Sequence, residues 1–282
     1  MFRVACIHMS IVSAVRLLAI PCVLVASALP IHAETNDQAL CASDDTTDDQ
    51  RIAACTTIIG SGSLDPKELA EAYRDRASAL QGKEDFDRAL ADANQAVALD
   101  PGSAKAFFRR GDIYKATDHV DSALQDFNTA IQLDPNVPVY FIDRSNVYLD
   151  KRDYANALSD IAEALRLDTS DAGEAILNRC NILAHKGDFD AALADCQKGL
   201  QQHPDDPYAV GGLGFVYYKM GKYDEAIAKY TSALGFSDLD SYDKAYLLYG
   251  RGLAKLKKDD KSGEADLAEA KGLSKTVYRE FE

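Results

Sequence analysis

The chain has 282 residues, of which 27% are charged and 47% are hydrophobic, with no tryptophan and 8 prolines. It carries 31 lysines and arginines against 45 aspartates and glutamates, a formal net charge of −14 at pH 7. This acidity argues against nucleic acid and anionic lipid as general partners, because both are polyanions.

Residues 1–33 have the order of a cleaved secretory signal peptide. The segment contains two arginines and no acidic residue. The arginines precede an apolar run over residues 17–29, and small residues follow this run. The run is short for a membrane span. We therefore expect export to the periplasm, cleavage between Ala28 and Ala33, and no stable membrane insertion afterwards. A retained membrane anchor is the alternative.

The segment after the signal peptide is acidic and contains two cysteines. Residues 34–49 are polar and acidic, which predicts a loop or a frayed start. A helical pattern follows over residues 50–59 and ends at a Gly-Ser-Gly-Ser sequence. We interpret residues 34–66 as an acidic start and a degenerate capping unit that contains Cys41 and Cys55.

From residue 67 to residue 272 one pattern of two apolar-periodic segments is repeated about every 34 residues. Small residues hold two fixed positions in each copy, and Leu-Asp-Pro closes several copies. The first small position is held by Ala89, Ala123, Ala157, Ala192 and Ala226. The second is held by Ala96, Ala130, Ala164, Gly199 and Ala233. Spacings of 34 or 35 residues separate the members of each series.

This period, with its order of aromatic, small and closing proline residues, resembles the tetratricopeptide repeat. The resemblance implies an all-α fold, a right-handed superhelical solenoid of antiparallel helix pairs, with about five good repeats and degenerate units at both ends. The good units start at Ala70, Ala104, Pro138, Gly173 and Pro207, and a partial unit starts near Ala245. Units must stack, because one hairpin cannot bury its apolar face alone. The tail, residues 273–282, is expected to extend the last helix or to fray.

Four cysteines remain after removal of the signal peptide, an even number that favours disulfides in an exported chain. Cys180 lies at a small position of its unit's first helix, and Cys196 lies where it would face that position. Cys41 and Cys55 are separated by 14 residues and Cys180 and Cys196 by 16. We predict the disulfides Cys41–Cys55 and Cys180–Cys196, with buried reduced thiols as the alternative. No CxxC motif is present, which argues against metal binding and thiol redox chemistry.

Two charged positions recur that do not belong to the common tetratricopeptide pattern. The arginines are Arg76, Arg110, Arg144 and Arg179, and the aspartates, each 16 residues later, are Asp92, Asp126, Asp160 and Asp195. The fifth unit lacks both members and has Leu213 and Lys229 in their place. This joint loss favours an Arg–Asp ion pair within each hairpin. Solvated charges on separate faces are the alternative.

We expect no enzymatic activity, no metal and no cofactor. The three histidines beyond residue 33 are scattered, and no glycine-rich phosphate loop joins a strand to a helix. The paired carboxylates fall at spacings typical of a solvated helix face. Nothing in this pattern meets the requirements of a catalytic site.

The resemblance also implies that first-helix side chains line a concave groove, which receives an extended peptide or a partner helix. The residues at those positions are Arg74, Lys105, Arg109, Asp112, Asn146, Asn178, Asn181, Tyr208, Tyr218 and Tyr249. They are basic at one end, rich in asparagine in the middle and aromatic at the other. Asparagine bonds both donors and acceptors of a peptide backbone, and tyrosine supplies interface anchors. Gly211 and Gly212 would leave room for a ligand backbone, while Phe108, Phe215 and Tyr246 also fit the core between repeats.

We therefore expect a non-catalytic adaptor or scaffold of the bacterial envelope, with a protein or peptide as its ligand and no nucleic acid. Two other functions stay open. One is a structural solenoid that associates with itself, and the other is an accessory subunit of an envelope enzyme or secretion complex.

Overall fold

The structure of the chain is a computed structural model that describes residues 31–167, 173–204, 206–274 and 277–281. The regular elements in these ranges are 14 α-helices and one short 3-10 helix. All of the predicted signal peptide except its last three residues lies outside them. None of the described helices has the length and apolarity that a membrane span requires.

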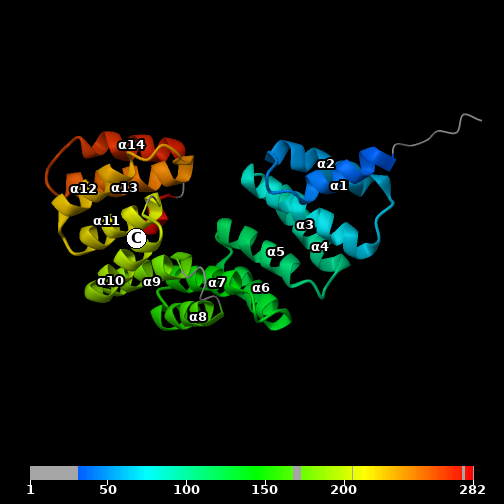
Figure 1. Cartoon of the computed structure of the whole chain (residues 1–282), viewed down its shortest axis with the longest axis horizontal. Helices are drawn as coiled ribbons and strands as arrows, with labels where there is room; N and C mark the ends of the chain where they lie inside the picture. Colours follow the sequence, from blue (N-terminus) through cyan, green and yellow to red (C-terminus); the bar gives the residue numbers. More distant parts are fainter. Residues whose placement is uncertain (1–30, 168–172, 205, 275–276, 282) are drawn as a thin grey trace, which may run out of the picture.

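The helices pair into hairpins in chain order (Figure 1). The capping pair is α1 (Ile31–Ala42) and α2 (Asp48–Ser61). The later pairs are α3 (Pro66–Gly82) with α4 (Phe86–Leu99), α5 (Ala104–Ala116) with α6 (Val120–Leu133), α7 (Pro138–Asp150) with α8 (Tyr154–Leu167), α9 (Gly173–Lys186) with α10 (Phe189–Gln202), α11 (Pro207–Lys219) with α12 (Tyr223–Ala233), and α13 (Ser241–Leu256) with α14 (Gly263–Leu273). The 3-10 helix η1 (Val277–Phe281) follows.

The pairs stack into an open arc, with α1 and α2 at one end and α13 and α14 at the other (Figure 1). First helices of successive pairs contact one another, from α3 to α5 and onward to α13. Helices α5, α7, α9 and α11 lie along the inner side of the arc, whereas α6, α8 and α10 lie on the outer side. The predicted all-α solenoid of helix pairs is confirmed, and its concave face is built from first helices.

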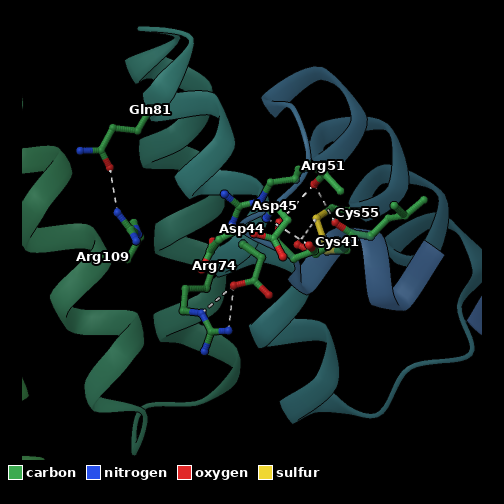
Figure 2. A network of polar contacts seen from close by, with 12 residues as sticks. Cys41, Asp44, Asp45, Arg51, Cys55, Arg74, Gln81 and Arg109 are labelled. Atoms are coloured by element: carbon green, nitrogen blue, oxygen red, sulfur yellow. Dashed lines mark hydrogen bonds and ion pairs between the residues drawn. A yellow bond between two sulfur atoms is a disulfide. The ribbon is translucent and has the colours of Figure 1, made fainter. Parts of the chain in front are cut away.

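The acidic segment predicted as a loop is partly helical, so that prediction is wrong for residues 34–42, which lie in α1. The helix forms because its end packs on α2, where Cys41 joins a small core with Cys55 and Ile58. A disulfide links Cys41 to Cys55, and a second links Cys180 to Cys196. Figure 2 shows the first disulfide beside Arg51. The capping unit is therefore a crosslinked hairpin.

The two helices of each pair approach closely at one crossing. On α5, a Cβ added to Gly111 would lie 3.0 Å from the ring of Phe127. On α11, a Cβ added to Gly214 would lie 3.0 Å from the ring of Tyr230. Both rings are fully buried, so the small residue lets the ring fill the crossing. In the pair α9 and α10, the Cys180–Cys196 disulfide takes this place.

The structure brings together each predicted Arg and Asp. The arginine Nε and Nη2 donate to the two carboxylate oxygens at 2.6–2.9 Å, a bidentate ion pair that joins the helices of one hairpin. The pairs are Arg76–Asp92, Arg110–Asp126, Arg144–Asp160 and Arg179–Asp195. Three of the aspartates are buried, with 3–7% of their surface exposed.

Three of these four arginines, Arg76, Arg110 and Arg144, also reach the preceding unit. Arg110 Nη1 donates to Asn94 Oδ1 of α4 at 3.1 Å, and Arg144 Nη1 donates to Asn128 Oδ1 of α6 at 2.6 Å. Arg76 makes the equivalent contact with α2. Each of these arginines therefore fixes its own hairpin and the stacking of two hairpins. We call this arrangement the arginine clamp.

The last unit, expected to be partial, is a complete helix pair with an ion pair of its own. Arg251 Nε donates to Asp266 Oδ2 at 2.8 Å, across 15 residues instead of 16. Burial would raise the pKa of Asp266, but Arg251 and Lys255 outweigh burial and lower it. This pair could not be predicted from the sequence pattern, because its two residues are 15 and not 16 positions apart.

Removing the cation of one clamp should destabilise the protein. We expect Arg144→Ala to lower the free energy of unfolding by about 3–5 kcal/mol, because Asp160 stays buried without its partner. Urea unfolding followed by circular dichroism measures the change. Arg166→Ala breaks an exposed pair with Glu163 and should leave the midpoint nearly unchanged. If Arg144→Asp and Asp160→Arg show additive losses when combined, the two residues do not interact.

Loss of the second disulfide should also destabilise the protein. Replacing both Cys180 and Cys196 by alanine should cost about 2–4 kcal/mol, because the crosslink restricts the unfolded chain. Thermal unfolding with and without the substitutions measures this difference. Peptide mapping under non-reducing conditions should recover both disulfides, and four free thiols or another linkage would contradict the pairing.

Candidate functional site

A polar network crosses the N-terminal half of the concave face. Arg109 of α5 donates to Asp112 at 3.2 Å and to Gln81 of α3 at 3.4 Å, and Gln81 donates to Asp112 at 2.9 Å. Figure 2 shows Gln81 and Arg109 facing each other from neighbouring helices. Lys115 then joins Asp112 to Asp143 of α7 at 3.4 and 2.5 Å. The network thus connects the first helices of three successive units.

Burial and charge shift the pKa values of the two residues at the end of this network. Burial alone would lower the pKa of Lys115, but Asp143 and Asp112 outweigh it and raise the pKa above its ordinary value. Burial and the nearby charge of Asp112 also raise the pKa of Asp143, and the positive charge of Lys115 offsets this rise only in part. Lys115 is therefore held charged between two carboxylates.

The predicted basic end of the groove needs correction, because its arginines are neutralised within the protein. Arg109 is paired with Asp112, and Arg74 donates twice to the neighbouring Asp75 at 2.8–2.9 Å. Lys105 is exposed and has no ion pair with another described residue. This part of the groove consequently offers little net positive charge to a ligand.

The predicted asparagines in the middle of the groove differ in their availability. Asn146 of α7 and Asn181 of α9 are half-buried, and neither hydrogen-bonds to another described residue. Asn178 is 7% exposed and donates to the carbonyl of Glu174 in its own helix at 3.1 Å. Asn178 is therefore less accessible to a ligand than Asn146 and Asn181.

A pocket lies at the aromatic end of the concave face, between α9, α11 and α13. It is a small hollow: the space of about 230 Å³ between its walls includes open solvent, and its enclosed part has room for about one water molecule. Its lining residues are Leu177, Asn181, Cys196, Tyr208, Gly212, Phe215 and Tyr246. Asn181 and Tyr208 were predicted as groove residues, and the structure places both in one pocket. Phe215 and Tyr246 are 1% and 7% exposed, so they line the pocket and also belong to the core between repeats.

The two adjacent glycines of α11 have different roles. A Cβ on Gly211 would lie 2.7 Å from Leu247 and 3.1 Å from Tyr246, so this glycine makes room for α13. A Cβ on Gly212 would lie 3.1 Å from the sulfur of Cys196. The expected room for a ligand backbone is therefore absent at Gly211, whereas Gly212 borders the pocket.

The chain's C-terminal turn reaches the same end of the concave face, and Figure 1 shows the chain end beside α11. The ring of Phe281 lies 5.3 Å from the ring of Tyr249 and 6.3 Å from that of Tyr218, measured between centroids. Val277 is fully buried and holds the turn against the core. The expectation of a helical extension or a frayed tail is wrong, because residues 277–281 form a separate 3-10 helix that packs on α13.

Burial shifts the pKa values of two residues of α11 in this region, Tyr218 and Lys219. Burial raises the pKa of Tyr218, with Tyr223 and Tyr249 adding to the effect. Lys219 Nζ lies 5.5 Å above the ring centroid of Phe215, and burial lowers its pKa. Phe108, at the other end of the groove, stacks on Tyr140 at 4.8 Å and packs between units.

No group of three or more His, Cys, Asp or Glu within the described ranges could hold a metal ion.

Family models of the tetratricopeptide repeat match residues 74–138 and 183–228. The first match runs from α3 to the start of α7, and the second runs from α9 into α12. The chain is a tetratricopeptide repeat protein. Such repeats typically form non-catalytic protein-interaction scaffolds, which supports a protein-interaction role for this one.

Solved structures of other tetratricopeptide repeat proteins share the fold. One from Parabacteroides merdae has a TM-score of 0.70 and 17% identity, covering 83% of this chain and 91% of its own. A chain of the APC/C hetero-tetramer Cut9–Hcn1 has a TM-score of 0.63 and 18% identity, covering 83% and 45%. PilW, a widely conserved type IV pilus biogenesis factor, has a TM-score of 0.58 and 18% identity, covering 76% and 96%. At these identities the likeness shows the fold alone.

One curated relative of this tetratricopeptide repeat protein is the photosystem I assembly protein Ycf3 of Prochlorococcus marinus. It is 30% identical over 93 residues, which are 26% of this chain and 54% of that protein. The chain thus spans about half the length of the relative it matches.

Proposed function

We propose that this tetratricopeptide repeat protein is a non-catalytic adaptor that binds an extended segment of a partner protein on its concave face. The observation that carries this proposal is the pocket between α9, α11 and α13. It combines apolar and aromatic walls with the side-chain amide of Asn181, the usual composition of a ligand site.

Asn181 in the pocket and Asn146 on the neighbouring first helix have hydrogen-bonding capacity left for a ligand. Asn146 and Asn181 lie on neighbouring first helices and make no hydrogen bond within the described ranges. Each amide can donate to a peptide carbonyl and accept from a peptide N–H. Packed helices lie about 8–10 Å apart, and an extended chain advances about 3.3 Å per residue. About every third ligand residue would therefore meet a new unit.

The charges of the concave face favour an apolar segment over an acidic one. The network of Arg109, Asp112, Lys115 and Asp143 is neutralised internally, so it adds little attraction for a charged ligand. The whole chain carries −14, which repels acidic partners at long range. The affinity for a partner segment would consequently depend on the side chains of that segment that enter the pocket.

We also propose that the protein works outside the cytoplasm, in the bacterial envelope. The order of basic, apolar and small residues in residues 1–33 supports export. Two buried disulfides support it further, because disulfides persist in oxidising compartments. N-terminal sequencing of protein from fractionated cells should find a chain that begins near Glu34. An intact Met1 on cytoplasmic protein would contradict export.

Removal of both free amides should weaken partner binding. A partner is first isolated by crosslinking and pull-down with the mature protein. We expect Asn146→Ala with Asn181→Ala to keep the melting temperature and to lose about 1–3 kcal/mol of binding free energy, because partner groups go unpaired. Titration calorimetry with the isolated partner measures this loss.

The matched control changes two exposed residues of second helices, Gln125→Ala in α6 and Lys198→Ala in α10. These changes should leave affinity unaltered. A partner that tolerates the groove changes but not the control changes would show that the groove is not the binding surface. Light scattering of the mature chain alone tests self-association, since oligomers that bury the groove would favour a structural role.

A further inference from the structure

The C-terminal turn of the chain occupies part of the concave face. Helix η1 contacts α13, and Phe281 places its ring among four aromatic rings at centroid distances of 5.2–6.3 Å. These rings belong to Phe215 and Tyr218 of α11 and to Tyr246 and Tyr249 of α13. We call this set of four residues the aromatic slot.

The rings around Phe281 have the arrangement of a binding site for an aromatic side chain. Phe215 and Tyr218 meet Phe281 edge-on, with interplanar angles of 73° and 78°. Tyr246 and Tyr249 are tilted against it at 32° and 43°. Both geometries suit the quadrupoles of aromatic rings. Phe281 itself is only partly buried, so its side chain closes the slot from the solvent side.

The aromatic slot continues the pocket in the groove. Phe215 and Tyr246 contact Phe281 and also line the pocket. A ligand that enters the pocket therefore meets the tail next along the concave face. The two features form one surface, of which the chain's own Phe281 fills one end.

We propose that the aromatic slot binds a phenylalanine side chain of the partner, and that Phe281 is a tethered competitor which the partner displaces. This inference rests on the groove binding proposed above. A short tether gives an effective concentration in the millimolar range. A free segment must therefore add contacts in the pocket to those in the slot. At low concentration, a partner segment that offers only an aromatic residue therefore does not displace Phe281 from the aromatic slot.

The position of the tail can be read with a single reporter, because the chain has no tryptophan. Phe281→Trp should emit at a shorter wavelength than Tyr278→Trp, since Phe281 is partly buried among four aromatic rings while Tyr278 is 37% exposed on the same turn. Both are full-length chains with every other residue kept. Equal emission from the two variants would overturn the proposal, because Phe281 would then lie outside the slot.

Displacement is tested with a synthetic pentapeptide, Tyr-Arg-Glu-Phe-Glu, the sequence of residues 278–282. At about millimolar concentration it should move the emission of the Phe281→Trp chain toward that of the exposed control. The peptide with alanine in place of phenylalanine should not. The fluorescein-labelled pentapeptide should also bind Phe281→Ala at least about tenfold more tightly than the native chain, because a tether no longer competes.

If neither displacement nor tighter binding to Phe281→Ala occurs, the tail is a fixed part of the fold and the proposal is wrong. This experiment uses only the chain and its own pentapeptide. Its failure therefore leaves partner binding by Asn146 and Asn181 untouched. Failure of the asparagine test, with displacement observed, would instead confine binding to the aromatic slot.

Discussion

The arginine clamp is the interaction on which the shape of this protein depends. In the clamp of Arg144, the guanidinium holds Asp160 of its own hairpin and Asn128 of the preceding one. Because the guanidinium is planar and rigid, it sets the angle within a pair and the stacking between pairs at the same time. Buried pairs of this kind contribute register more than net stability. Repetition of the clamp at Arg76, Arg110 and Arg144 fixes the N-terminal half of the arc, whose first helices face inward.

The two halves of the concave face use their side chains differently. In the N-terminal half, Lys115 and its carboxylates satisfy one another, which fixes the first helices but leaves little for a ligand. In the C-terminal half, Asn181 and the aromatic residues leave a pocket. The Cys180–Cys196 disulfide supplies one wall of that pocket, so this wall is covalently fixed before a ligand binds. Such preorganisation reduces the entropy lost on binding.

Features that repeat with the period of the chain could be predicted from the sequence, and features that depend on how units meet could not. The Arg–Asp pairs and the cysteines of α9 and α10 are separated by 16 residues, which places them across one hairpin, so their pairing follows from local geometry. The link between Lys115 and Asp143 depends on the rotation between two units, which no spacing specifies. Asn178 and Asn181 lie one turn apart, and only the packing of neighbouring helices buries one and leaves the other in the pocket. The contact of Phe281 with α11 and α13 lies outside the repeat pattern, so the period of the sequence gives no indication of it.

The central claim is that the concave face, and not the outer face, binds the partner. Site-specific photo-crosslinking tests it most directly, with a photoreactive phenylalanine placed at Tyr208 on the pocket wall or at exposed Lys198 of α10. In cells that express the full-length chain, the account predicts that the same partner is captured from Tyr208 and not from Lys198. Capture from Lys198 alone would contradict it.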